Sequence, residues 1–169
     1  LAEVGLHKQV VNRILEPFQL MRTIVTATEW SNFFHLRDHE DAQPEIRALA
    51  IAMREAMEGS QPTRRMSWEW HLPYVLDYER GRLKDDLLPK LSTARCARVS
   101  YLTHDGAFPD VDKDIALYER LVGSRPLHAS PIEHQARVIN LNNDEIGLNG
   151  NFSPLWVQHR KLLETERAV

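Results

Sequence analysis

The chain has 169 residues, of which 43% are hydrophobic and 27% are charged, and its formal net charge is −3. These values are ordinary for one globular domain, and they argue against wholesale disorder. Both signs of charge are interspersed, which argues against nucleic-acid binding through a basic face. The single cysteine, Cys96, excludes an internal disulfide and fits a reducing, cytoplasmic compartment. No apolar run approaches the roughly 18 residues of a membrane span.

The first third of the chain predicts a helix, an extended segment and a second helix. Residues 4–16 have helical apolar spacing and end at Pro17. Residues 21–28 are short and rich in β-branched side chains, which predicts extended backbone. Residues 29–37 predict a short helix with Thr28 as its N-cap.

The clearest amphipathic helix is expected between Asp41, as its N-cap, and Gly59, with Pro44 in its first turn. Its apolar stripe consists of Ile46, Leu49, Ala50, Met53 and Met57. Residues 60–90 hold several prolines and a mixed charge run, which predicts a long, loose connection within one domain.

The second half of the chain predicts two more helices, a strand and a charged C-terminal helix. A helix is expected over residues 91–102, and Asp110 is expected to cap another that stops at Gly123. A strand over 133–141, a turn-rich stretch over 142–153 and a charged helix over 154–169 complete the expected order.

Residues 29–37 hold the most informative side chains in the chain. Aromatic residues there can seat a short helix on the protein while Asn32 and Arg37 face something polar. The planar guanidinium of Arg37 suits a phosphate or a carboxylate. Residue types alone favour a plainer alternative, in which Arg37 pairs with Asp38 or Asp41 on a surface helix.

Other reactive side chains have weaker patterns. His35 and His39 stand four residues apart and could ligate a metal. No third ligand is evident, and we expect no bound metal. Cys96 has arginines nearby that could lower its thiol pKa, although a buried small hydrophobe is the favoured role. Residues 128–134 group imidazoles, a hydroxyl and a carboxylate, yet no nucleophile-elbow motif accompanies them. No glycine-rich phosphate loop is present.

Five short segments form a set when they are read together. They are residues 12–17 (Asn-Arg-Ile-Leu-Glu-Pro), 32–37 (Asn-Phe-Phe-His-Leu-Arg), 42–46 (Ala-Gln-Pro-Glu-Ile), 97–101 (Ala-Arg-Val-Ser-Tyr) and 128–134 (His-Ala-Ser-Pro-Ile-Glu-His). This set resembles the motifs of the flavin-dependent thymidylate synthase family, the ThyX type. The paired match of the second and fourth segments is the specific part of the resemblance, since any one segment alone would be weak.

The order of these segments differs from the common family order, in which the last two come first. The chain therefore resembles a circularly permuted, phage-like branch, a rearrangement that is physically reasonable where termini lie close together. The arginine- and serine-rich family signature is absent, and residues 156–160 (Trp-Val-Gln-His-Arg) echo only its opening. In a permuted order the signature would precede Leu1, so we expect this chain to be a fragment of the family domain.

The resemblance implies roles for particular residues. Arg13 and Arg37 would bind dUMP, and Arg37 would also touch the flavin. The residues implied at the FAD site are Asn32, Arg37, Ser100, Ser130 and Glu133. His128 and Arg37 would be the catalytic residues, and no metal is implied.

Three positions depart from the family pattern. Asp41 stands where the family has a histidine that contacts the flavin. Residues 26–28 (Thr-Ala-Thr) replace an Asn-x-Arg element and so lose an arginine. Gln158 replaces an arginine if residues 156–160 correspond to the signature.

We therefore expect an α+β fold, with helices packed on a small, mainly antiparallel sheet, and active sites shared within a homotetramer. The implied reaction is reductive methylation of dUMP to dTMP, with FAD as the cofactor and methylenetetrahydrofolate and NADPH as co-substrates. The alternative is a non-catalytic binding or assembly module that keeps the fold but lacks the signature. Neither nucleic acid nor a membrane is an expected partner.

Overall fold

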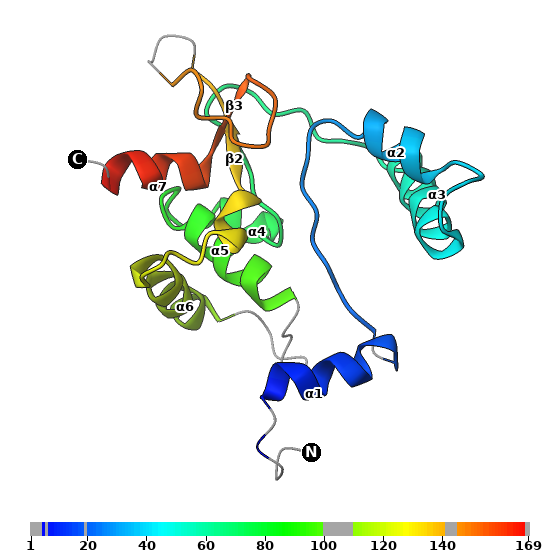
Figure 1. Cartoon of the computed structure of the whole chain (residues 1–169). Coiled ribbons are helices and arrows are strands. Elements are labelled where there is room, and N and C mark those ends of the chain that lie inside the picture. The colour runs from blue at the N-terminus through cyan, green and yellow to red at the C-terminus, as the bar shows by residue number, and fades with distance from the viewer. Residues whose placement is uncertain (1–4, 6, 19, 100–109, 141–144, 168–169) are drawn as a thin grey trace.

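The computed structural model describes residues 5, 7–18, 20–99, 110–140 and 145–167. Within these ranges, seven α-helices accompany one three-stranded antiparallel sheet (Figure 1). The predicted α+β class, with helices on a small antiparallel sheet, is confirmed.

The bounds of the elements are as follows. The α-helices are α1 (Lys8–Leu15), α2 (Ser31–Arg37), α3 (Pro44–Glu58), α4 (Asp77–Arg80), α5 (Leu88–Arg98), α6 (Val111–Gly123) and α7 (His159–Arg167). Two short 3-10 helices are η2 (Glu16–Phe18) and η4 (Ser130–Glu133), and the strands are β1 (Trp70–His71), β2 (Ala136–Val138) and β3 (Trp156–Gln158). The strand order is β1-β2-β3, with Trp70 opposite Arg137 and Arg137 opposite Val157.

The core forms around α5, which packs against α6 and η4. Leu88 and Leu91 of α5 pack against Leu72 and Val75, which follow β1. Ile132 of η4 is also completely buried. Every residue of α5 from Leu88 to Cys96 except Lys90 is buried, so this helix is the axis around which the other elements pack.

A buried ionic cluster holds α4, α5 and α6 together. The Arg95 guanidinium donates to both carboxylate oxygens of Glu79, at 2.6 and 2.7 Å, and to the Asp114 carboxylate at 2.7 Å. A fourth hydrogen bond, of 2.8 Å, reaches the Tyr74 carbonyl. Arg98 also forms an ion pair with Asp114. Hydrogen bonding from Arg95 lowers the pKa of Glu79, so the pair is charged at neutral pH.

A second buried polar contact joins α6 to α7. The His159 ring lies 3.3 Å from the Tyr118 hydroxyl and meets the edge of Trp70 at a centroid distance of 5.8 Å. Burial, with a smaller contribution from the charge of Lys90, lowers the pKa of His159 to about 4. His159 is therefore neutral in the folded protein at pH 7.

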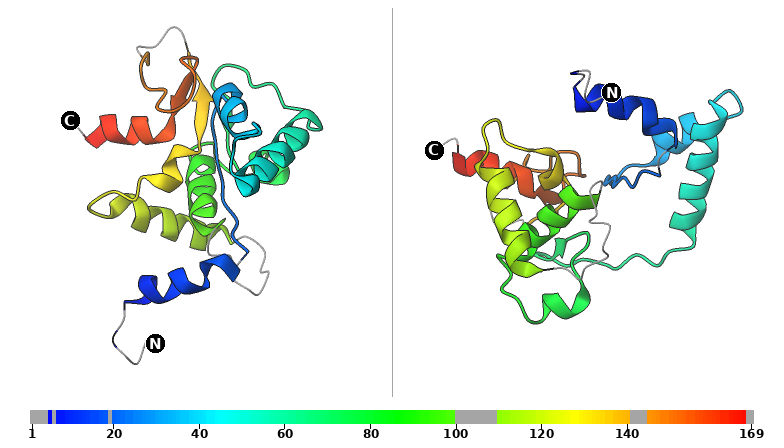
Figure 2. Two further views of the ribbon diagram at one scale, coloured as in Figure 1. Left: turned by 45° about the vertical axis from the view of Figure 1, so that its right-hand side comes forward. Right: turned by 90° about the horizontal axis from the view of Figure 1, so that it is seen from below.

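The N-terminal elements form an arm that projects from this body (Figures 1 and 2). The first helix was predicted over 4–16. The structure gives α1 and then η2, which contains Pro17, while residues 1–4 lie outside the described ranges. Ile14 and Phe18 are exposed, by 58% and 86%, so the apolar side of this arm is not packed on the body.

Residues 21–28 have extended backbone, as predicted, but they pair with no strand among the described residues. Two predicted N-caps are wrong. Trp30 occupies the cap position of α2, and the Thr28 hydroxyl accepts a hydrogen bond of 2.8 Å from the Ser153 amide. Gln43, not Asp41, precedes α3.

The other predicted boundaries hold to different degrees. Pro44 begins α3 and Gly59 ends it, as expected, although Leu49 and Met57 of its apolar stripe are exposed. The 60–90 connection is largely irregular, but it supplies β1, α4, the start of α5 and three of the four buried residues of the core cluster. The Asp110 cap of α6 is confirmed by a 3.1 Å hydrogen bond from the Lys113 amide.

The bounds of two elements predicted for the C-terminal part of the chain are wrong. The predicted strand over 133–141 is limited to β2, because Pro131 and its neighbours form the tight turn of η4. The predicted helix over 154–169 begins only with α7, because residues 156–158 pair with β2 as strand β3. Trp156 and Val157 suit a strand better than a helix, and this signal was missed.

The first prediction concerns the buried cluster. Arg95→Met should lower the free energy of unfolding by about 3–5 kcal/mol, because it leaves Glu79 buried without its cationic partner and Asp114 with Arg98 alone. Urea unfolding followed by circular dichroism measures this change. Lys113→Met, which removes an exposed ion pair with Asp110, is the control and should cost at most about 1 kcal/mol. Equal effects of the two substitutions would contradict the structural role of Arg95.

The second prediction concerns pH. The folded-state pKa of His159 lies below its unfolded value of about 6.5, so the unfolded chain binds the proton more tightly. The stability that His159 contributes is therefore present above pH 6.5 and is lost as the pH falls toward 4. Urea unfolding across this range should show the loss, and His159→Gln should make the dependence shallower. An imidazole NMR signal of His159 that titrates near pH 6.5 in the folded protein would contradict this prediction.

Candidate functional site

Helix α2 carries two of the predicted site residues, and an aromatic cluster fixes it in place. Trp30, Phe33 and Phe34 pack against one another with ring centroids 5.4–6.1 Å apart. The Trp30 indole also donates a 3.1 Å hydrogen bond to the Ala27 carbonyl. Helix α3 packs against α2. The aromatic cluster thus holds α2 in place, while the polar side chains of α2 remain in solvent.

Arg37 is exposed at the end of α2 and forms no ion pair with any residue in the described ranges. The plainer alternative placed Arg37 against Asp38 or Asp41. Asp38 instead pairs with Arg54 and, at 3.9 Å, with Arg47. Asp41 lies 3.5 Å from His39. That alternative is therefore wrong, and Arg37 is available to an outside anion.

Arg13 lies on α1, at the opposite end of the extended segment from α2 (Figure 1). About ten residues of extended backbone span roughly 30 Å. Arg13 is also exposed and has no ion-pair partner in the described part of the chain. One copy of the chain does not bring Arg13 and Arg37 together.

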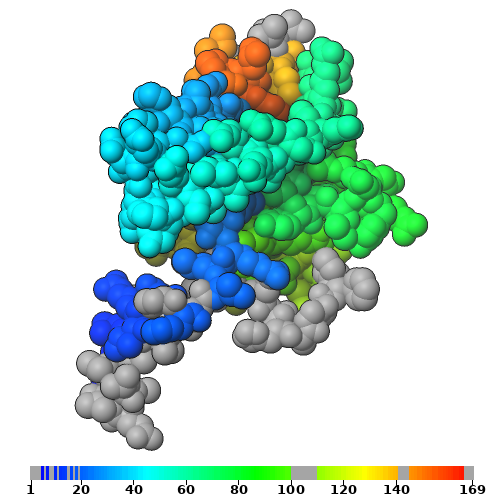
Figure 3. Space-filling model, turned by 90° about the vertical axis from the view of Figure 1, so that its right-hand side faces the viewer, coloured from blue at the N-terminus to red at the C-terminus, as the bar shows by residue number. Residues whose placement is uncertain are grey.

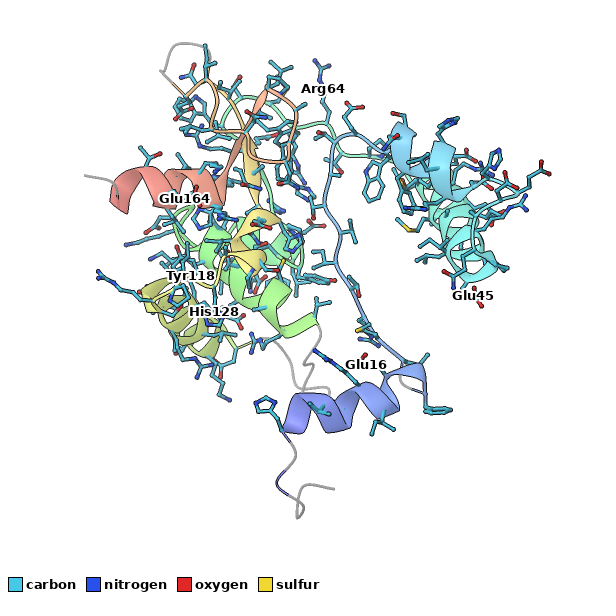
Figure 4. The ribbon with its side chains drawn as sticks, viewed as in Figure 1. Glu16, Glu45, Arg64, Tyr118, His128 and Glu164 are labelled. Atoms are coloured by element: carbon cyan, nitrogen blue, oxygen red, sulfur yellow. The ribbon has the colours of Figure 1, made fainter. Side chains whose placement is uncertain are left out.

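The 128–134 segment supplies three further predicted residues from the other side of the molecule. His128 is exposed beside α6, where its amide donates to the Leu121 carbonyl at 3.4 Å (Figure 4). Ser130 is exposed at the start of η4. The Glu133 carboxylate forms an ion pair with Arg160 of α7. Ser100, the remaining predicted FAD contact, lies outside the described residues.

The residues that replace the family's Asn-x-Arg element make contacts within the protein. The Thr26 hydroxyl lies 3.1 Å from Nδ1 of His134, and the Thr26 carbonyl accepts a 2.9 Å hydrogen bond from Asn151. The Thr28 hydroxyl accepts from Ser153. These contacts tie the extended segment to the η4 region and to the turn before β3.

Beside this junction lies a cavity of about 470 Å³. Its walls come from the extended segment and α3 on one side and from the sheet region on the other. The lining residues are Ile24, Val25, Thr26, Ala27, Thr28, Trp30, Met57, His71, Pro73, Phe152 and Trp156. None of the predicted contact residues is among them. Sequence reasoning missed this cavity because its lining residues come from separate segments, of which His71, Pro73 and Phe152 lie in stretches that were interpreted as loops.

Two side chains considered for chemistry have other surroundings. Cys96 is buried beside Gln135, and burial raises the pKa of its thiol to about 12, so the thiolate is not formed at neutral pH. This agrees with the structural role favoured for Cys96. His35 and His39 belong to no group of three or more potential metal ligands among the described residues.

Comparison with known proteins adds one finding. Residues 17–63 match the family model Thy1, described as thymidylate synthase complementing protein. The resemblance to the ThyX family is thereby confirmed over this segment, which runs from η2 through α2 and α3 and contains Asn32 and Arg37. No curated protein and no solved structure matches the chain. No helix in the described ranges is long and apolar enough to cross a membrane.

The third prediction concerns Cys96. Because its thiol is buried and protonated, we expect it to react with Ellman's reagent only when the protein unfolds. Absorbance of the released thiolate dye, followed in buffer and in denaturant, measures the difference. Rapid reaction in buffer at pH 8 would contradict the structural role and reopen a nucleophilic one.

Proposed function

We propose that this chain is part of a flavin-dependent thymidylate synthase that methylates dUMP reductively to dTMP. The observation that carries the proposal is the family match over residues 17–63, which includes the whole of α2. Methylenetetrahydrofolate would supply the carbon and NADPH the reducing equivalents. The enzyme needs no protein nucleophile in this chemistry, which agrees with the buried state of Cys96.

The electrostatics of α2 support nucleotide binding. A nucleotide phosphate is dianionic near neutral pH and is best held by fixed cationic donors. Arg37 and Arg13 are exposed guanidinium groups that no described carboxylate neutralises. We therefore assign both to dUMP, with Arg37 also at the boundary with the flavin.

The side chains around α2 and η4 fit a flavin cofactor in part. Asn32 and Ser130 are exposed polar groups that could hydrogen-bond to FAD. Glu133 would have to loosen its ion pair with Arg160 before it met a ligand. A bound flavin supplies hydride transfer, and the role of these residues is to bind and orient it. His128, exposed beside α6, is proposed to face the region where substrate and flavin meet.

The separation of Arg13 from Arg37 supports an active site shared between copies of the chain. Each site would take α2 from one copy and α1 from another, as the proposed homotetramer requires. The arm that carries Arg13 also exposes Ile14, Phe18 and Leu20, which are apolar side chains suited to burial against a second subunit.

One observation favours the non-catalytic alternative. If residues 156–160 correspond to the signature, Gln158 replaces an arginine; it is buried, and its amide donates to the Glu133 carbonyl at 3.1 Å. A structural glutamine and a paired Glu133 are what a module that had lost its flavin would retain. The discriminating experiment is colour: the enzyme should purify yellow or take up added FAD, whereas the module should do neither.

The fourth prediction tests Arg37 directly. Arg37→Lys should weaken dUMP binding by about tenfold or more while the fold is kept, because a lysine cannot form the paired hydrogen bonds of a guanidinium. Isothermal titration calorimetry measures the affinity. The control is Arg64→Lys, at an exposed arginine that lies away from α2 (Figure 4). Equal dUMP affinity in both variants would remove Arg37 from the site.

A further inference from the structure

The carboxylate that directly follows Arg37 is bound by two arginines of helix α3. Asp38 is the C-cap residue of α2, and its side chain is only 11% exposed. The Oδ2 atom of Asp38 forms an ion pair with Nη1 of Arg54, and its Oδ1 atom lies 3.9 Å from Nε of Arg47. Each carboxylate oxygen thus meets a guanidinium of α3, while the neighbouring Arg37 is exposed and has no ion pair within the described ranges.

Helix α3 presents both arginines to the same point of α2. Arg47 and Arg54 stand seven residues apart, which is about two helical turns, so their side chains leave the same face of α3. That helix packs against α2 (Figure 1). Arg54 donates a hydrogen bond to Asp38. The contact of Arg47 is longer than a hydrogen bond, and its buried Nε has no hydrogen-bond partner among the described residues. Arg54 is therefore the residue that binds Asp38, and Arg47 adds a charge.

This pairing sets the charge that an anion meets at Arg37. An unpaired carboxylate one residue away would repel a phosphate. With Arg47 and Arg54 beside Asp38, three guanidinium groups accompany one carboxylate, and these four side chains carry a net charge of +2. Glu58 lies 4.0 Å from Nε of Arg54, but its side chain is 71% exposed, so solvent screens its charge.

We propose that Arg54 is a positioning residue for the anion site at Arg37. By binding Asp38, Arg54 holds this carboxylate on α3 and leaves the Arg37 guanidinium free to pair with a phosphate. The inference rests on the proposed function, because the phosphate that it considers is that of dUMP. A plainer role is that the pair of Asp38 and Arg54 only holds α2 against α3. The two roles predict opposite results when both charges are removed together.

The first measurement is the affinity of the full chain for dUMP by isothermal titration calorimetry. Arg54→Met leaves Asp38 without its hydrogen-bond donor and removes one positive charge, so it should weaken dUMP binding by about fivefold. The double variant, Arg54→Met with Asp38→Asn, also removes the carboxylate and should recover an affinity within about twofold of the unchanged chain. Arg54→Lys keeps the charge and should likewise stay within about twofold. A purely structural pair predicts that the double variant binds dUMP as weakly as Arg54→Met does.

Two further variants complete this measurement. Arg64→Met removes the same charge at an exposed position away from α2 and is the matched control, with no change in affinity expected (Figure 4). Asp38→Asn alone should not weaken dUMP binding, and this variant decides the question if Arg54→Met fails to fold. Loss of affinity in Asp38→Asn, unchanged affinity in Arg54→Met, or failure of the double variant to recover would each overturn the proposal.

The second measurement follows Arg37 without a nucleotide. Phenylglyoxal reacts with the neutral form of an exposed arginine, and an adjacent unpaired carboxylate disfavours that form. Peptide mass spectrometry should show that Arg37 reacts about threefold more slowly in Arg54→Met and at its original rate in the double variant. Arg64 should react equally in all variants. Equal rates at Arg37 throughout would overturn the proposal. Absence of dUMP binding by the unchanged chain would instead remove the proposed function, since the reaction of Arg37 still decides the role of Arg54.

Discussion

The pairing of Arg95 with Glu79 and Asp114 is the constraint on which the body of this protein depends. A guanidinium buried in the last turn of α5 is tolerable only if its donors are matched, and four hydrogen bonds to three separate segments provide that match. Because the partners come from α4, α6 and the loop before α4, satisfying one side chain fixes the relative position of all three. The apolar cluster around Leu88 and Leu91 packs within the arrangement of helices that the hydrogen bonds of Arg95 define.

The N-terminal third is held to this body by a different and weaker set of contacts. Hydrogen bonds join Thr26 to His134 and Asn151, and Thr28 to Ser153, with no sheet pairing among the described residues. Helices α2 and α3 lie over one side of the molecule, while α1 stands away from it (Figure 3). The segment that carries the family match is therefore held to the body by few contacts within a single copy, which is compatible with a site shared between subunits.

The sequence predicted some local boundaries correctly, but it failed where distant partners decide the structure, as at Thr28, whose hydroxyl binds Ser153 and does not cap α2. Asp110 caps α6 and Pro44 starts α3 because those preferences are local. The β3 strand and the structural use of Arg95 depend on residues that lie far away in the chain, and neither was predicted. Residue types alone favoured an ion pair for Arg37 on a surface helix; α2 has no buried residue, but the described residues give Arg37 no such pair. The role in ligand binding that the motif context assigns to Arg37 stays a prediction.

The resemblance predicts an Asn-x-Arg element at residues 26–28, where this chain has Thr-Ala-Thr. An asparagine and an arginine there would present long polar side chains to a ligand, whereas the two threonine hydroxyls contact His134 and Ser153. Thr26 and Thr28 also line the cavity beside Trp30 and His71, and no carboxylate, lysine or arginine lines it. The exposed guanidinium groups that could hold a phosphate lie elsewhere, on α2 and α1. The two threonines therefore anchor the extended segment and bring no charge to the cavity wall.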